Sequence, residues 1–184
     1  PRGKWTLARS DIGELPFKDN CFDGVVCSEV MEHIPGEDKA LKELVRVLKP
    51  GGRLVITVPQ FWPETLCWKL SREYHHTPGG HIRIYRKSRL VRQVRRQGMI
   101  PRGSHHAHAL HALYWWLKCL TGVHRTDVGL VNLYHRLLVW DLMEKPPVTR
   151  ILERLLNPIM GKSLVLYFQK PARHSDNRTT IQNR

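Results

Sequence analysis

Two short apolar segments separated by an amphipathic one constrain the fold of this chain more than any other feature. Residues 22–27 form an apolar run bounded by turn-forming residues, and residues 53–58 form a second run that stops at Pro59. Between them, residues 38–48 carry apolar side chains at the i, i+3, i+4, i+7 spacing of a helix packed on a core. A strand, a helix and a strand at this distance predict a right-handed βαβ unit, and therefore an α/β fold with a parallel sheet.

Three sequence motifs in and around this unit resemble a known family. The first covers residues 11–23 with the pattern Asp-x-x-x-Leu-Pro-Phe-x-Asp-x-x-Phe-Asp. The second is Glu-His-Ile at 32–34, and the third is Arg-Val-Leu-Lys-Pro-Gly-Gly at 46–52. In this order and spacing they resemble the class I S-adenosylmethionine (SAM)-dependent methyltransferases, more narrowly the methyltransferase type 11-like enzymes that act on small molecules and lipid quinones.

The resemblance implies a Rossmann-like methyltransferase sheet. Residues 163–169 predict a strand that Lys-Pro at 170–171 ends, and in the family such a last strand runs antiparallel to the others. The helix-compatible stretch before it is expected to be an insertion that forms a lid over the substrate. We therefore divide the chain into four parts: a methyltransferase core (1–103), a helical insertion or lid (104–157), a final core strand (158–171) and a disordered tail (172–184).

No Gly-rich turn of the G-x-G-x-x-G kind lies between a strand and a helix in this sequence. In the family that it resembles, such a turn holds the carboxylate end of SAM. We therefore expect the domain to be N-terminally incomplete here, with the first two strands and most of the third outside the printed sequence and residues 5–8 as a remnant of the third. On this interpretation the 184 residues bind SAM weakly by themselves.

Positive charge is concentrated in the second part of the chain. The formal net charge is +14; residues 1–60 carry nine basic and nine acidic side chains, whereas residues 61–184 carry 21 basic and 7 acidic ones. This asymmetry indicates an anionic partner, and we favour an acidic membrane surface over nucleic acid; a solvated basic surface is the alternative. The four cysteines form no C-x-x-C pair and no apolar run is long enough to span a bilayer, so we expect a cytoplasmic protein, peripheral to a membrane.

The resemblance assigns the SAM-binding residues. Asp11 matches the family position whose carboxylate accepts a hydrogen bond from the adenine amino group, and Ile12 lies beside the ring. Ser28 and Glu29 follow the next family strand and are expected to face the methionine end of SAM. The alternative for Asp11 is that it caps a turn, as aspartate commonly does.

Glu29, Glu32 and His33 are the sharpest local pattern. At i, i+3 and i+4 they lie on one face of a helical turn, so two carboxylates and an imidazole could hold Mg²⁺ or Zn²⁺. The Glu-x-x-Glu-His motif also resembles the metal-binding motif of quinone-pathway O-methyltransferases. A metal-free role, in which His33 orients a loop, is the alternative.

His81 and His33 are the candidate catalytic residues. His81 follows a long segment, residues 60–80, that is expected to overhang the active site, and histidine titrates near neutrality, which suits proton removal. A surface histidine on a Gly-Gly turn is the alternative. Four further histidines, at 105, 106, 108 and 111, are expected to form a hydrogen-bonded, partly exposed stripe on a helix of the lid, with a metal site as the alternative.

Together these features predict a SAM-dependent methyltransferase that acts on a small-molecule or lipid-like acceptor, with oxygen as the expected acceptor atom. Two alternatives remain open. The net charge of +14 favours an RNA or tRNA methyltransferase. The missing Gly-rich turn favours a non-catalytic basic binding module derived from the same fold.

Overall fold

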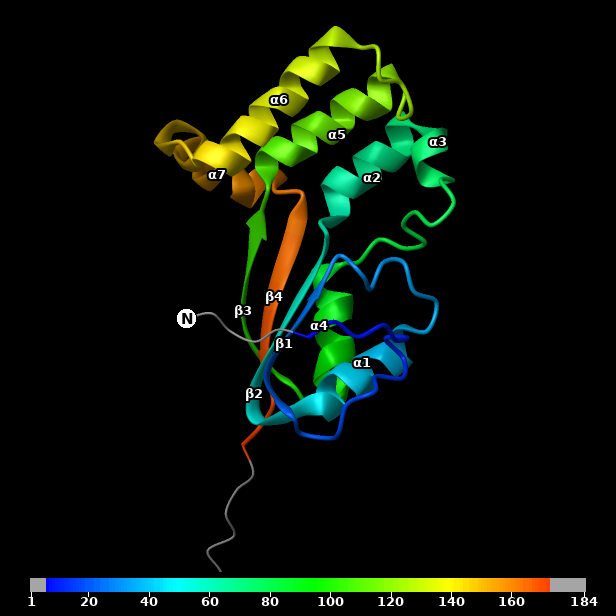
Figure 1. Ribbon diagram of the computed structural model, residues 1–184, viewed down its shortest axis with the longest axis vertical. Coiled ribbons are helices and arrows are strands. Elements are labelled where there is room, and N and C mark those ends of the chain that lie inside the picture. The colour runs from blue at the N-terminus through cyan, green and yellow to red at the C-terminus, as the bar shows by residue number, and fades with distance from the viewer. Residues whose placement is uncertain (1–5, 173–184) are drawn as a thin grey trace, which may run out of the picture.

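A computed structural model describes residues 6–172 (Figure 1). The sheet and helices have the following bounds: β1 Phe22–Ser28, α1 Glu37–Val47, β2 Leu48–Pro59, α2 Phe61–Leu70, α3 Arg72–His75, α4 Lys87–Arg96, β3 Ile100–Ala107, α5 Ala109–Thr121, α6 Gly129–Glu144, α7 Pro147–Met160 and β4 Ser163–Gln169. The expected tail at 173–184 and the first five residues lie outside the described part. Residues 6–8, part of the expected strand remnant, form no strand.

The four strands form one mixed sheet in the order β1-β2-β4-β3. β1 and β2 are parallel, with Cys27 opposite Ile56, and α1 connects them. β4 lies between β2 and β3 and is antiparallel to both, with Leu166 opposite Ile56. The predicted βαβ unit and the antiparallel last strand are therefore confirmed. Because β1, β2 and β3 run in the same direction, their carboxyl ends lie at one edge of the sheet.

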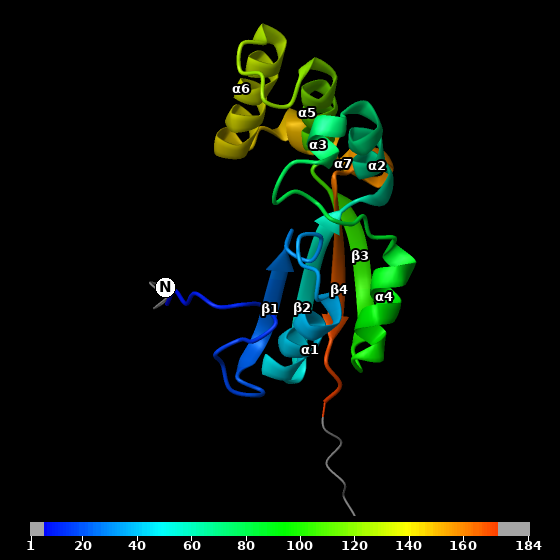
Figure 2. The same cartoon turned by 90° about the vertical axis from the view of Figure 1, so that its right-hand side faces the viewer.

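A single apolar core joins the sheet to the two helices that cover one of its faces, α1 and α4 (Figure 2). The helical stripe in α1 buries Leu41 and Leu44, and α4 buries Leu90 and Val94 between its exposed arginines. These side chains pack on the inward-facing residues of β2 and β4. The periodicity of the sequence thus determines which face of each helix is buried.

The remaining helices lie beyond the carboxyl edge of the sheet, where α5, α6 and α7 form a layer with α2 beside α5 (Figure 1). Gly161 permits the tight entry from α7 into β4, because a Cβ there would lie only 2.7 Å from the Cβ of His106. Within the described residues, no helix combines the length and the apolar character needed to cross a membrane.

Two segments differ from the sequence-based expectation. Residues 104–107, expected to be helical, lie in β3, where His105 pairs with Val165 and its ring stacks on Tyr167. Pairing with β4 overrides the weak helical preference of this histidine-rich stretch, and the helix begins only at Ala109. The segment 60–80, expected to be an irregular connection, forms α2 and α3. The division of the chain into a core and a lid stays a prediction.

Ile56 tests the packing of this core, since it is fully buried at the centre of the sheet. Ile56→Ala is expected to lower the free energy of unfolding by about 2–5 kcal/mol, because the lost side chain leaves a cavity. The measurement is urea denaturation followed by circular dichroism. Val26→Ala, at a position that is 70% exposed on β1, is the control and should change stability by less than about 1 kcal/mol. Equal losses would contradict the described core.

Candidate active site at the carboxyl edge of the sheet

The loop at residues 11–19 is held against α1 by one guanidinium group. Arg46 donates hydrogen bonds to the carbonyl oxygens of Leu15 (3.0 Å) and Phe17 (2.7 Å) and to the carboxylate of Glu43. Glu43 also accepts from the Leu15 N–H at 2.8 Å. The hydrogen bonds from Arg46 and from the Leu15 N–H lower the pKa of Glu43 to about 2. Arg46, which belongs to the third motif, therefore fixes the loop that carries Asp11 and Ile12.

A hollow of about 560 Å³ lies between this loop and β1. Ile12 lines it from the loop, and Ser28 lines it from the end of the strand; most of the other lining side chains are apolar. Asp11 precedes Ile12, is exposed, and accepts a hydrogen bond from the Gly13 N–H at 2.6 Å. Two of the four expected SAM-binding residues thus line one hollow, and the Asp11 carboxylate also caps its own turn.

Glu29 does not occupy a helical turn, so this part of the sequence-based expectation is wrong. Its φ of 51° places it in the left-handed region, where an isolated residue can reverse the chain but a helix cannot continue. Its carboxylate accepts from the Thr57 hydroxyl at 2.9 Å, and the Thr57 oxygen also pairs with the Ser28 hydroxyl at 2.9 Å. Glu29 is therefore tied to β2, and it is not part of the nearby group of side chains that could hold a metal ion.

His81 takes the place of Glu29 in that group. Glu32, His33 and His81 each offer a ligand atom, and these atoms lie within 4.8 Å of one another. The Nε2 atoms of His33 and His81 lie 3.9 and 4.0 Å from the Glu32 carboxylate. The Nδ1 of His33 lies 3.0 Å from the Gly79 carbonyl oxygen, and the Nδ1 of His81 lies 2.6 Å from a Glu64 oxygen. Since both partners are acceptors, each Nδ1 carries a hydrogen, and in the neutral form of each ring the Nε2 lone pair is available.

The Glu32 carboxylate is the group in the site whose burial costs the most folding free energy. The residue is fully buried, and neither carboxylate oxygen has a hydrogen-bond partner among the described residues. Burial, aided by the charge of Glu29, raises the pKa of Glu32 to about 7, although the nearby His81 opposes the shift. A buried acceptor pair without donors is the environment that a cation or a proton stabilises.

Glu64, in contrast, is buried with several partners. Its carboxylate accepts from His81 and, at 3.3 Å, from the Tyr74 hydroxyl, and Lys162 lies 3.9 Å away. Burial alone would raise the pKa of Glu64, but the hydrogen bond and charge of His81, with Lys162, bring it below its usual value. Burial and the adjacent Glu64 charge raise the pKa of Tyr74. Glu64 thus remains ionised and orients the His81 ring.

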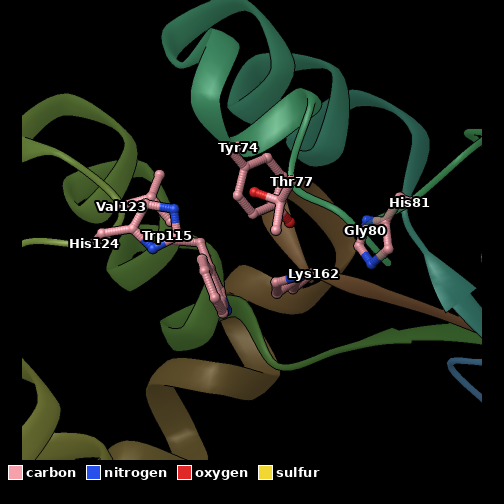
Figure 3. Close-up of a pocket in the computed structure, with 8 residues that line it drawn as sticks. All are labelled: Tyr74, Thr77, Gly80, His81, Trp115, Val123, His124 and Lys162. Carbon is pink, nitrogen blue, oxygen red and sulfur yellow. The ribbon is translucent and has the colours of Figure 1, made fainter.

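A second, smaller pocket opens beside His81. Its volume is about 210 Å³, and Figure 3 shows Tyr74 and Lys162 between His81 on one side and Trp115 on the other. The wall contributed by α5 is aromatic, whereas the side toward the sheet is polar. The pocket therefore combines an apolar surface with a histidine, His81, whose Nδ1 is hydrogen-bonded to Glu64.

Sequence reasoning did not identify Glu64, Tyr74 or Lys162. They come from α2, α3 and the residue just before β4, and only the topology brings them to His81. One signal was present, because Glu64 is the lone acid in the apolar stretch 61–70. The histidine-rich segment also differs from its expectation: His105 lies on β3, whereas His108 and His111 meet Glu153 of α7 with ligand atoms within 4.8 Å of one another.

Residues 2–56 match the family model described as "Methyltransferase domain". The ubiquinone/menaquinone biosynthesis C-methyltransferase UbiE of Haemophilus ducreyi is 46% identical over 54 residues, which are 29% of this chain and 21% of that protein. The demethylmenaquinone methyltransferase of Streptomyces avermitilis is 50% identical over 50 residues, covering 27% of this chain and 22% of the relative. The chain thus spans about a fifth of the length of these curated relatives.

The similarity to solved structures covers more of the chain. A crystal structure of a SAM-dependent methyltransferase from Archaeoglobus fulgidus superposes with a TM-score of 0.54 at 17% sequence identity. The superposition covers 92% of this chain and 69% of the other. At this identity the similarity establishes the methyltransferase fold, including the mixed sheet, and nothing about the substrate.

The raised pKa of Glu32 predicts a pH-dependent stability. The folded state holds the Glu32 proton up to a pH of about 7, whereas the ordinary value is 4.5, so folding loses free energy as the pH rises through that interval. Between pH 5 and 8 in a chelating buffer, the stability of Glu32→Gln relative to the parent chain should rise by about 2–3 kcal/mol. Urea denaturation at both pH values measures the difference. A difference that stays constant across this range would refute the assigned environment.

Proposed function

We propose that this chain, whose residues 2–56 are part of a class I SAM-dependent methyltransferase domain, contributes to methyl transfer onto a small, lipid-like acceptor. One observation carries the proposal. The hollow lined by Ile12 and Ser28 extends along β1 to its carboxyl end at Ser28, and Glu32 and His33, which with His81 form the candidate metal group, follow that end in the chain. Ligands of open α/β sheets bind at such an edge.

The donor side of the site is assigned to the hollow beside β1. Its apolar lining suits the adenine ring of SAM, with Ile12 against the ring and Asp11 accepting from the adenine amino group. Ser28 and Glu29 would face the methionine end, held in place through Thr57. The chemical role of these residues is to orient the sulfonium methyl group toward the neighbouring pocket, because in-line displacement requires aligned donor and acceptor atoms.

The acceptor side is assigned to His81 and its pocket. Glu64 holds the Nδ1 hydrogen of His81, so in the chain without a metal the Nε2 atom is free to take a proton from an acceptor hydroxyl. His33 lies beside it, with ring centroids 4.9 Å apart, and is held by the Gly79 carbonyl. Trp115 and Tyr74 supply aromatic walls for the acceptor. An oxygen acceptor fits this arrangement best, whereas the Haemophilus ducreyi relative named above is described as a C-methyltransferase.

A divalent metal fits the group of Glu32, His33 and His81. The Glu32 carboxylate is buried without donors, and the Nε2 atoms of the two histidines lie about 4 Å from it. Two imidazoles and one carboxylate favour Zn²⁺ over Mg²⁺, which prefers oxygen ligands. When bound, such an ion lowers the pKa of a coordinated acceptor hydroxyl. Glu64 would then act as the partner that orients the His81 ligand.

RNA methylation is the second candidate, and α4 is the observation that favours it. Arg89, Arg92, Arg95 and Arg96 are all exposed on this helix. Such a basic face would bind RNA with an affinity that falls steeply as salt rises. Methyl transfer to an RNA, and none to catechols or quinols, would select this candidate.

Asp11→Asn tests the donor site. Asparagine keeps an oxygen for the Gly13 N–H, but it replaces the second carboxylate oxygen with an NH₂ group that cannot accept from adenine. The affinity for S-adenosylhomocysteine, titrated by NMR so that weak binding is detected, should fall roughly three- to tenfold. Glu14→Gln, at an exposed position of the same loop, is the control. Unchanged affinity in Asp11→Asn would leave Asp11 with only its turn-capping role.

Glu32→Gln tests the metal site without reference to activity. The substitution keeps the shape of the side chain but removes the anionic ligand. Calorimetric titration of the chain with Zn²⁺ should show binding to this group that Glu32→Gln weakens at least roughly tenfold. His105→Gln, on the exposed face of β3, should leave that binding unchanged. If both variants bind Zn²⁺ as the parent chain does, the three residues do not hold the metal.

A further inference from the structure

The apolar side of α7 faces solvent. Helix α7 places large apolar residues at the i, i+3, i+4, i+7 spacing that normally marks the core-facing side of a helix. All are exposed: Val148 65%, Ile151 58%, Leu152 43%, Leu155 66% and Ile159 66%. Soluble monomers rarely leave a contiguous apolar stripe of this kind uncovered, and such surfaces mark a binding site.

Polar contacts fix α7 in this orientation. Thr149, which is buried, donates its hydroxyl hydrogen to the Asp141 carboxylate of α6. Asn157 accepts from the Ala109 N–H, the first backbone donor of α5, at 2.9 Å. Glu153 faces inward as well, toward His108 and His111. Rolling the helix to bury its apolar stripe would break these hydrogen bonds, so the exposed stripe is the stable arrangement within the described residues.

Helix α6 adds a second apolar surface. It packs on α5 through one side, where Val131 and Leu138 are buried. The rest of the helix is still mostly apolar, and the exposed residues there are Leu130, Leu133, Leu137, Val139, Trp140, Leu142 and Met143. A groove of about 500 Å³ runs along this side between Leu133 and Trp140. We call these residues, with the stripe of α7, the α6–α7 surface. It lies at one end of the long axis of the molecule, beyond the sheet (Figure 1).

The charges around this surface are mainly positive. Arg136, Lys145, Arg150 and Arg154 are exposed on or between the two helices, whereas Glu144 is the exposed acid in the same stretch, since Asp141 is buried and Glu153 is partly buried. Apolar residues that include a tryptophan, bordered by basic side chains, are typical of helices that lie in the interface of an anionic bilayer. A second copy of the same surface would bring like charges together. At about 24 Å, α6 is also too short to cross the bilayer.

We propose that the α6–α7 surface docks the chain on an anionic phospholipid membrane, with both helices lying in the plane of the interface. The occupant is the headgroup and upper acyl region of the lipid: the apolar side chains enter it, and the arginines contact phosphate groups. This proposal does not depend on methyl transfer, because it concerns a surface that the candidate active site does not use.

Sedimentation with vesicles tests the proposal without a methyl donor. The chain is expected to bind vesicles made of equal parts phosphatidylglycerol and phosphatidylcholine, and to bind pure phosphatidylcholine at least roughly tenfold more weakly. Leu155→Asp, in the exposed stripe, should lower the affinity for the mixed vesicles at least roughly tenfold. Leu7→Asp is the matched control, because Leu7 is 84% exposed and lies away from these helices.

A double charge reversal on α7, compared with one on α4, distinguishes binding through the α6–α7 surface from attraction by the overall positive charge of the chain. Arg150→Glu with Arg154→Glu should reduce binding to the mixed vesicles much more than Arg92→Glu with Arg96→Glu, which makes the same charge change on α4. Circular dichroism checks that each variant is folded. No binding to the mixed vesicles, or equal effects of the two pairs, would overturn the proposal. A dimer that Leu155→Asp dissociates, without vesicle binding, would also overturn it and identify a second copy as the occupant.

Discussion

Parallel pairing of β1 with β2 is the constraint on which the rest of the structure depends. Because α1 returns the chain to the start of the sheet, both strands end at the same edge, and the loops that follow them must converge. The convergence is visible in one backbone contact, in which the Ile82 N–H donates to the Glu32 carbonyl at 3.0 Å. Arg83 strengthens it by donating to the carbonyls of Met31 and Ile34. Without this strand pairing, the loops that carry Glu32 and His81 would not be brought together.

The two buried glutamates at this edge are in different states. Glu64 is surrounded by donors and stays ionised, so it stabilises the position of His81. Glu32 is buried without donors and is costly in its charged form. Titratable groups whose burial costs folding free energy are concentrated in functional sites, because a ligand or a proton that binds there offsets that cost. The contrast is the physical reason to place the chemistry at Glu32, His33 and His81.

Local periodicity was sufficient to predict the βαβ unit and the last strand. The family resemblance, and not periodicity, predicted that Ile12 and Ser28 would lie at one site, and both residues line the hollow beside β1. Sequence reasoning was wrong for Glu29, since nothing in the spacing of Glu29 and His33 reveals a residue with positive φ between a strand and a turn. It also missed β3, because the partner strand of β3 lies about sixty residues away in the sequence. Glu64 and Lys162 were missed as well, because only the folded chain brings them to His81.

A crystal structure of the chain soaked with S-adenosylhomocysteine tests the central claim most directly, namely that the edge formed by β1 and β2 is a SAM site. The account predicts density for the adenine ring beside Ile12 and for the sulfur atom near Ser28, on the side toward His81. Density for the ligand in the pocket between Tyr74 and Trp115, with the hollow beside β1 empty, would contradict it.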